Sequence, residues 1–264
     1  MATAALLCAC VLAPAPASSG ASTTRARAER PEAHPTTLTA ALSPERLGAA
    51  TTIRIGFRVS TPASGTPSPV TDVQLLLPPG LSIATSDLGL ETCVLSKLEG
   101  GGAAACPPDS LMGRGSALTE VPFGSTFVTE PASVTLFSAP LKNGHPQLLF
   151  LASGELPVLT RLVFGALVMP AGAPFGTLID TTLPLVPSVR GGPDVALVQL
   201  QTTIGAKGIV YYERVKGKTI SFRPRSLLLP ARCPRGGFRF SAHLTFQDGT
   251  RSSAATTVPC PRHT

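Results

Sequence analysis

Apolar and polar residues alternate along short segments of this chain, and the alternation predicts β-strands. The clearest case is segment 51–60 (TTIRIGFRVS), in which every second residue from Ile53 to Val59 is apolar. The residues between them are arginine or glycine. Successive side chains of a strand point to opposite faces, so this pattern predicts a strand with one buried face and one exposed face.

Similar segments recur along the rest of the chain. They are rich in β-branched residues and are bounded by Pro, Gly or Ser, as strands usually are. Asn143-Gly144 and Asp248-Gly249 are typical of tight hairpin turns. Apart from one or two helical turns expected in 91–98, no amphipathic helical period appears. Further strands are expected at 36–42, 70–77, 116–121, 125–129, 133–137, 147–151, 161–169, 176–183, 195–204, 218–229, 238–246 and 252–258.

The predicted fold is therefore all-β. A total of roughly a dozen strands exceeds the seven of a single immunoglobulin-like β-sandwich. We expect two such sandwiches in tandem, stabilised by disulfides, at 36–155 and 156–264. One large sandwich with insertions is the alternative interpretation.

Residues 1–20 are typical of an export signal. The apolar stretch AALLCACVLA is followed by Ala15-Pro16-Ala17, which fits the small-residue rule for signal peptidase. Residues 21–35 are polar, charged and interrupted by proline, so we expect a flexible leader. No later apolar run approaches the roughly 18 residues that a membrane-spanning helix needs. The sequence thus predicts a secreted or cell-surface protein without a transmembrane span after signal removal.

Four cysteines remain after the predicted signal. An even number in an exported protein favours disulfides, and loop closure favours pairing between near neighbours in sequence. A zinc site is the competing interpretation, but the chain has no Cys-x-x-Cys pair. The predicted disulfide residues are Cys93, Cys106, Cys233 and Cys260.

Positive charge is concentrated near the C-terminus. The net charge of the whole chain is +7, and residues 207–264 hold 11 Lys and Arg against only Glu213 and Asp248. Rings interleaved with cations suit polyanions, so an anionic cell-wall polymer or another surface polyanion is the expected partner. A solvated outer face of strands explains the same residues without a ligand, and no recognition helix for specific nucleic acid is visible. The candidate polyanion-binding residues are Arg214, Lys216, Lys218, Arg223, Arg225 and Arg239.

Two sets of residues contain the side-chain types found in the active sites of hydrolases. Ser241, His243 and Asp248 could form a triad, but Ser241 and His243 are two residues apart on one predicted strand, which favours a surface or hydrogen-bonded histidine. Scattered acids could also supply the carboxylate pair of a glycosidase, once a fold sets their spacing. No catalytic residue is assigned on this basis. The acids are Glu155, Asp180 and Asp194.

Gly113-Arg114-Gly115 contains two glycines at a spacing found in nucleotide-binding loops. The remaining glycines of a dinucleotide fingerprint are missing, as is its strand-to-helix context. The favoured interpretation is a strand whose glycines let another backbone approach closely. We therefore expect no cofactor and no metal.

Several segments resemble a group of uncharacterised exported proteins of high-GC Gram-positive bacteria. The resemblance implies an extracellular β-sandwich and carries no known activity. Taken with the residues, it leads us to expect a non-enzymatic binding or structural module, with a secreted hydrolase as the alternative. The matching segments are 70–81 (VTDVQLLLPPGL), 106–117 (CPPDSLMGRGSA), 233–240 (CPRGGFRF) and 258–261 (VPCP).

Overall fold

The structure is a computed structural model that describes residues 34–60, 67–83, 87–154 and 160–261. The chain divides into two units, 1–31 and 32–264, and all described residues lie in the second. The predicted signal (1–20) lies outside the described residues, as do most of the leader and the predicted domain boundary at 155–156.

The described residues form an all-β fold, as the sequence predicts. They contain one short α-helix, α1 (Leu95–Gly101), and two 3-10 helices, η1 (Gly102–Ala105) and η2 (Pro108–Ser110). The strands are β1 (Thr36–Ser43), β2 (Ala50–Val59), β3 (Val70–Leu77), β4 (Ser82–Ile83), β5 (Leu111–Phe123), β6 (Thr126–Lys142), β7 (His145–Gly154), β8 (Arg161–Pro170), β9 (Thr177–Thr182), β10 (Ala196–Ile204), β11 (Tyr211–Val215), β12 (Lys218–Phe222), β13 (Leu227–Leu228), β14 (Phe238–Phe246) and β15 (Arg251–Val258).

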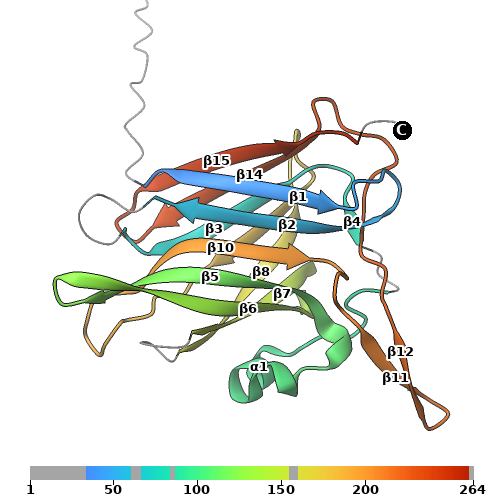
Figure 1. The fold of residues 1–264 in the computed structure, drawn as a ribbon, viewed down its shortest axis with the longest axis horizontal. Coiled ribbons are helices and arrows are strands. Elements are labelled where there is room, and N and C mark those ends of the chain that lie inside the picture. The colour runs from blue at the N-terminus through green and yellow to red at the C-terminus, as the bar shows by residue number, and fades with distance from the viewer. Residues whose placement is uncertain (1–33, 61–66, 84–86, 155–159, 262–264) are drawn as a thin grey trace, which may run out of the picture. The chain divides into compact units, whose positions relative to one another are not determined.

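Thirteen of these strands belong to one sheet, and β11 and β12 form a separate two-stranded sheet. The order of the large sheet is β15-β14-β3-β9-β8-β7-β6-β5-β10-β2-β13-β4, with β1 also paired to β2. The neighbouring strands of this sheet are antiparallel. Figure 1 shows β1 beside the β14–β15 pair from the opposite end of the order, so the sheet curls around an interior.

Strands from the two predicted domains are interleaved within this sheet. β9 and β8 of the second predicted domain lie between β3 and β7 of the first, and β10 of the second lies between β5 and β2 of the first. These pairings join residues far apart in sequence, which local alternation of apolar residues does not specify. The immunoglobulin-like sandwich and its tandem arrangement are therefore not confirmed, whereas the all-β class is.

Large and small side chains occupy different parts of the interior. The alternation predicted for β2 is confirmed, because the apolar residues from Ile53 to Val59 are all buried. Phe57 and the phenylalanines of β14 (Phe238, Phe240 and Phe246) fill the part of the core near β2 and β14. Inner positions of β5, β6 and β7 carry alanine instead, and these small residues leave space.

Turn and strand glycines lie where the sequence predicts them. Asn143 and Gly144 both have positive φ, 53° and 77°, at the turn between β6 and β7. A Cβ on Gly113 would meet the carbonyl oxygen of Thr203, and one on Gly115 would meet that of Gln201. The interpretation of these two glycines as places of close backbone approach is confirmed.

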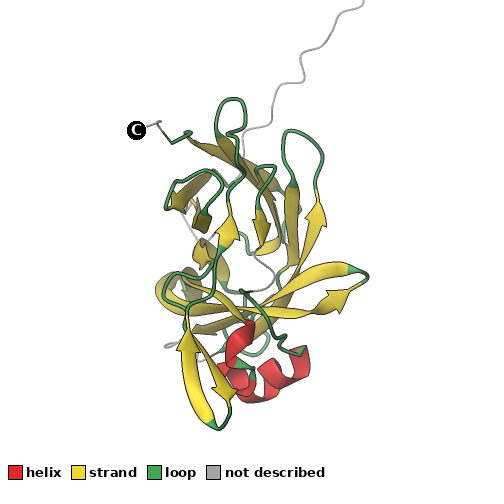
Figure 2. Ribbon diagram, turned by 90° about the vertical axis from the view of Figure 1, so that its right-hand side faces the viewer, coloured by secondary structure: helices red, strands yellow, loops and turns green. Residues whose placement is uncertain are grey.

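A second, smaller core lies on the outer face of β6 and β7. Leu98 of α1 packs there with Phe137 and Leu149, and Figure 2 shows the helical segment on one side of the strands. The Cys93–Cys106 disulfide belongs to this core, and a second disulfide joins Cys233 to Cys260. Both disulfides pair near neighbours in sequence, as loop closure favours. None of the helices in the described ranges is long and apolar enough to cross a membrane.

Candidate functional site

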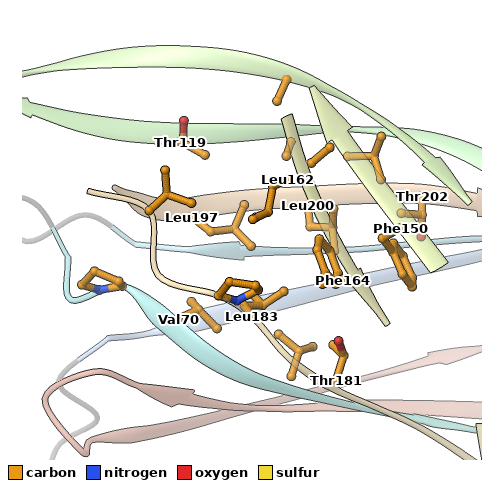
Figure 3. A pocket seen from close by; sticks show the side chains of 18 of the residues that line it. Val70, Thr119, Phe150, Leu162, Phe164, Thr181, Leu183, Leu197, Leu200 and Thr202 are labelled. Atoms are coloured by element: carbon orange, nitrogen blue, oxygen red, sulfur yellow. The ribbon is translucent and has the colours of Figure 1, made fainter. Parts of the chain in front are cut away.

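An apolar cavity of about 130 Å³ lies inside the curl of the sheet, and we call it the first cavity. Side chains from seven strands, β3 and β5 to β10, surround it, and Figure 3 shows several of them directed into the same space. Phe150 and Phe164 stack on one wall, with ring centroids 5.0 Å apart. Phe164, Leu162 and Leu197 are only half-buried although they point inward, because they border this open space.

The polar side chains of the first cavity are three threonines, and each of their hydroxyl groups already donates a hydrogen bond to a backbone carbonyl oxygen. The Thr119 hydroxyl donates to the carbonyl oxygen of Glu130 at 3.3 Å, and that of Thr181 donates to Gly165 at 2.8 Å. The Thr202 hydroxyl donates to the carbonyl oxygen of Ile55 at 3.4 Å. Because these donors are used within the sheet, the wall favours apolar ligands.

A second cavity, of about 360 Å³, adjoins the first. Ile179 and Ile204 line both cavities, so the two spaces meet at these side chains. The second cavity is also mainly apolar, but its wall contains Ser138 and Gln147, which are polar and uncharged. Within the described part of the chain, no charged side chain lines either cavity.

The pattern of residues along the chain does not predict these cavities. The only local signals are alanines at inner strand positions, such as Ala117, Ala132 and Ala152. They come together only through the pairing of β5 with β6 and of β6 with β7. Alanine in a strand also fits ordinary packing, so the signal is readable only once the register is known.

Three of the predicted polyanion-binding residues lie on the β11–β12 hairpin. Arg214, Lys216 and Lys218 are exposed around its turn, and Lys216 has a positive φ of 50°. Figure 1 shows this hairpin projecting away from the large sheet. No carboxylate among the described residues forms an ion pair with these three cations.

Tyr211 anchors the base of this hairpin. Its ring is fully buried and meets Phe222 edge-on at 5.4 Å. Its hydroxyl donates to the carbonyl oxygen of Leu111 at 2.9 Å and accepts from the amide of Gly89 at 2.7 Å. Burial raises the pKa of Tyr211, and the negative charge of Asp109 adds to that rise. The phenol therefore stays neutral and holds the hairpin in place.

The other predicted cations lie apart from the hairpin turn. Arg223 follows β12 and is exposed, while Arg225 pairs with Asp87. Arg239 lies on β14 of the large sheet, with its guanidinium 5.8 Å from the ring centre of Phe175. The structure thus separates the six residues and leaves Arg214, Lys216 and Lys218 as one exposed group.

The candidate hydrolytic acids are only partly brought together. Asp180 and His243 line a polar groove of about 640 Å³ on the outer face of β9, β3, β14 and β15. Gln74 pairs with both of them across the sheet, so they are two strands, about 10 Å, apart. Asp194 instead accepts a hydrogen bond from Gln247 at 2.9 Å. Glu155 lies outside the described residues.

Ser241, His243 and Asp248 do not assemble into a triad. The Ser241 hydroxyl lies 3.5 Å from Nε2 of His243, but Ser241 is buried and donates to the carbonyl oxygen of Ala254 at 3.2 Å. Asp248 binds His34 and Thr250. Partial burial opposes the charge of Asp248, but its hydrogen bonds to Thr250 and His34 outweigh that effect and lower its pKa. His34, expected in the flexible leader, is buried against Phe246, with ring centroids 4.3 Å apart.

The two adjoining cavities are the best-formed candidate site of the described residues. They lie within the curl of the main sheet and are mainly apolar, whereas the outer groove is a polar surface without a catalytic contact between its acid and its histidine. The case for the cavities is geometric and chemical. No protein-family model, curated protein or solved structure matches the chain significantly.

Proposed function

We propose that this chain is an exported, non-enzymatic binding module that holds an elongated apolar ligand, of the class of fatty acyl chains, inside its curled sheet. The observation that carries this proposal is the pair of adjoining cavities, whose described lining residues are uncharged. The threonine hydroxyls of the first cavity already donate within the sheet, so none of them is left to donate a hydrogen bond to a ligand. Burial of methylene groups remains as the driving force, at about 0.8 kcal/mol each.

The proposed location outside the cytoplasm is supported by the cysteines. Cys93 is bonded to Cys106, and Cys233 is bonded to Cys260. Disulfides persist mainly in oxidising compartments. An exported carrier of an acyl chain also needs an interior that shields the chain from water, which the curled sheet supplies.

Filling the first cavity is expected to weaken ligand binding. Ala152 lines this cavity on β7, so Ala152→Phe places a ring in the space that the ligand would occupy. If about ten methylene groups are buried, the gain of about 8 kcal/mol corresponds to a Kd near 1 μM. Titration with a fluorescent fatty acid is expected to show this affinity, weakened at least about tenfold in Ala152→Phe.

Ala255→Phe is the matched control for this experiment. Ala255 is exposed on β15 and does not line either cavity, so the same change there leaves the affinity unaltered. Equal affinities of wild type and Ala152→Phe, or no binding by the wild type, would contradict the proposal.

A secreted hydrolase is the second candidate function. It is favoured by one observation, the outer groove that contains both Asp180 and His243. Because that groove lies outside the curled sheet, an activity located there would persist in Ala152→Phe. The same variant therefore separates the two functions.

We also propose that the β11–β12 hairpin attaches the protein to a polyanion such as an anionic wall polymer. The support is the exposed group of Arg214, Lys216 and Lys218 around the turn. The exposed ring of Tyr212 lies on the same hairpin and adds a surface for stacking. Rings beside cations suit flexible anionic chains.

Neutralising the hairpin is expected to weaken retention on immobilised heparin. The variant is Arg214→Ser, Lys216→Asn and Lys218→Ser, with Asn chosen because it tolerates the positive φ of residue 216. At about 1 kcal/mol for each cation, affinity falls about 100-fold at low salt. Arg239→Gln, on the large sheet, is the control and is expected to elute like the wild type. Unchanged elution of the triple variant would remove the hairpin as the attachment site.

A further inference from the structure

The tip of the β5–β6 hairpin is exposed, apolar and uncharged. β10 begins at Ala196, which pairs with Glu120, so residues 121–128 extend past the neighbouring strand. Figure 1 shows this hairpin reaching beyond the strands around it. The eight residues (VPFGSTFV) contain no charged side chain. Phe123, Phe127 and Val128 are 69%, 42% and 43% exposed.

One face of this hairpin leads from the first cavity to the tip. Thr119 lines the cavity, and side chains alternate along a strand, so Val121 and Phe123 follow on the same face. Val128 pairs with Val121 on that face. Glu130, opposite Thr119, is the charged residue of this face, and it is buried rather than presented at the surface. In the exposed part of this face, Phe123 and Val128 are apolar, and Thr126, which pairs with Phe123, is polar but uncharged.

The segment between β9 and β10 forms a second apolar element at the same end of the sheet. Leu185 lines the first cavity and is 41% exposed, and Val189 is 64% exposed. The Ser188 amide donates to the Pro193 carbonyl oxygen at 2.9 Å, which holds this segment as a narrow loop. Because the loop runs directly into β10, it reaches the sheet beside β5.

We propose that these two elements form a rim that inserts into a lipid bilayer, where the first cavity receives an acyl chain. The rim residues are Phe123, Phe127, Val128, Leu185 and Val189. This inference rests on the proposed function, because the acyl chain is the ligand assigned to the cavity. The hairpin tip offers no charge to a charged partner, so a bilayer fits it better. Arg190, exposed next to Val189, has a long side chain whose charged end can stay at the level of the lipid headgroups.

The chemistry of the rim agrees with shallow insertion. Large exposed apolar side chains are costly in water and mark interaction sites when they gather. A charged side chain within the hydrocarbon costs several kcal/mol, and the tip carries none. Leu185 belongs both to the rim and to the cavity wall. An acyl chain that leaves the bilayer at Leu185 thus meets the cavity wall directly.

Flotation with phosphatidylcholine vesicles tests this inference on the full chain. The tip variant is Phe123→Ser with Phe127→Ser. The matched control is Val215→Ser with Ile220→Ser, which removes two exposed apolar side chains from the β11–β12 hairpin. We expect the tip variant to lower the bound-to-free ratio at least about tenfold, because two inserted rings are lost. The control stays within about twofold of the wild type.

Salt dependence and ligand affinity complete the test. Because the apolar side chains of the rim make the bilayer contact, binding is expected to change less than about twofold between 50 mM and 500 mM NaCl. The tip variant is also expected to keep the fatty-acid affinity of the wild type in solution, since its changes lie outside the cavity. Unfolding midpoints of all variants confirm that they are folded.

The outcomes distinguish the rim from the cavity. The proposal of a bilayer-inserting rim is overturned if the wild type does not bind vesicles or if the tip variant binds them as well as the wild type. It is also overturned if salt abolishes the binding of the wild type. In contrast, tip-dependent vesicle binding without any fatty-acid binding in solution supports the rim and overturns the cavity function. Loss of vesicle binding in the β11–β12 control would assign the bilayer contact to that hairpin and overturn the rim.

Discussion

Phe240→Ala is expected to lower the free energy of unfolding by about 3–5 kcal/mol. Phe240 lies on β14, between β3 and β15, and its side chain has no exposed surface. It belongs to the main core together with Phe238 and Phe246 of the same strand. Removing the ring loses its burial and leaves a void that the surrounding strands fill only in part. Urea denaturation followed by circular dichroism measures the change.

Phe123→Ala is the control for this prediction, because it makes the same chemical change at a residue that is 69% exposed. We expect it to alter stability by less than about 0.5 kcal/mol. Similar losses for the two variants, or a loss below about 1 kcal/mol for Phe240→Ala, would show that β14 is not central to the core. A result of that kind would also remove the enclosed interior on which the cavity depends.

Much of the local structure is predictable from sequence. The alternation around Ile55 identifies β2 and its buried face, and Asn143-Gly144 identifies the turn between β6 and β7. Loop closure favours the observed disulfide pairing among the three that four cysteines allow, because Cys93 and Cys106 are only 13 residues apart. Each of these features depends on residues near one another in the chain, so the local sequence pattern is enough to predict it.

The strand boundaries predicted between residues 125 and 137 are wrong in detail. The sequence predicts separate strands at 125–129 and 133–137, divided near Pro131. The structure has a single strand there, β6, whose pairing with β5 continues through Leu118 and Pro131. A proline interrupts a strand only where its missing N–H is needed by a neighbour. Which N–H groups are needed depends on the register, which the sequence pattern does not contain.

The sheet order and the candidate site depend on pairings between distant residues. Gln74 of β3 pairs with His243 of β14 on one side and with Asp180 of β9 on the other. No periodicity selects these partners, because many half-buried strands would fit the same apolar face. The cavities exist only after seven strands are ordered, and the exposed tip at Phe123 exists only because β10 stops short of it.

Removing the Cys93–Cys106 disulfide is expected to lower stability by about 3 kcal/mol. The bridge closes a loop with a sequence separation of 13, and a loop of this size restricts the unfolded chain by about that amount. Cys93 is fully buried beside Leu98, and its amide donates to the carbonyl oxygen of Ser138 at 2.8 Å. The Cys93→Ser and Cys106→Ser variant therefore also loosens the packing of α1 on β6.

Trypsin reports this local loosening directly, because Lys97 lies exposed within α1. Cleavage after Lys97 is expected to be at least about tenfold faster in the double variant than in the wild type, since proteolysis follows the population of locally opened chain.

The Cys233→Ser and Cys260→Ser variant is the control. Its bridge closes a longer loop, with a separation of 27, so its global loss is about 3.5 kcal/mol. Under native conditions that control leaves α1 pinned by the first bridge, and cleavage at Lys97 stays slow. Equal cleavage in the two variants would mean that the first disulfide stabilises the whole sheet rather than the α1 segment.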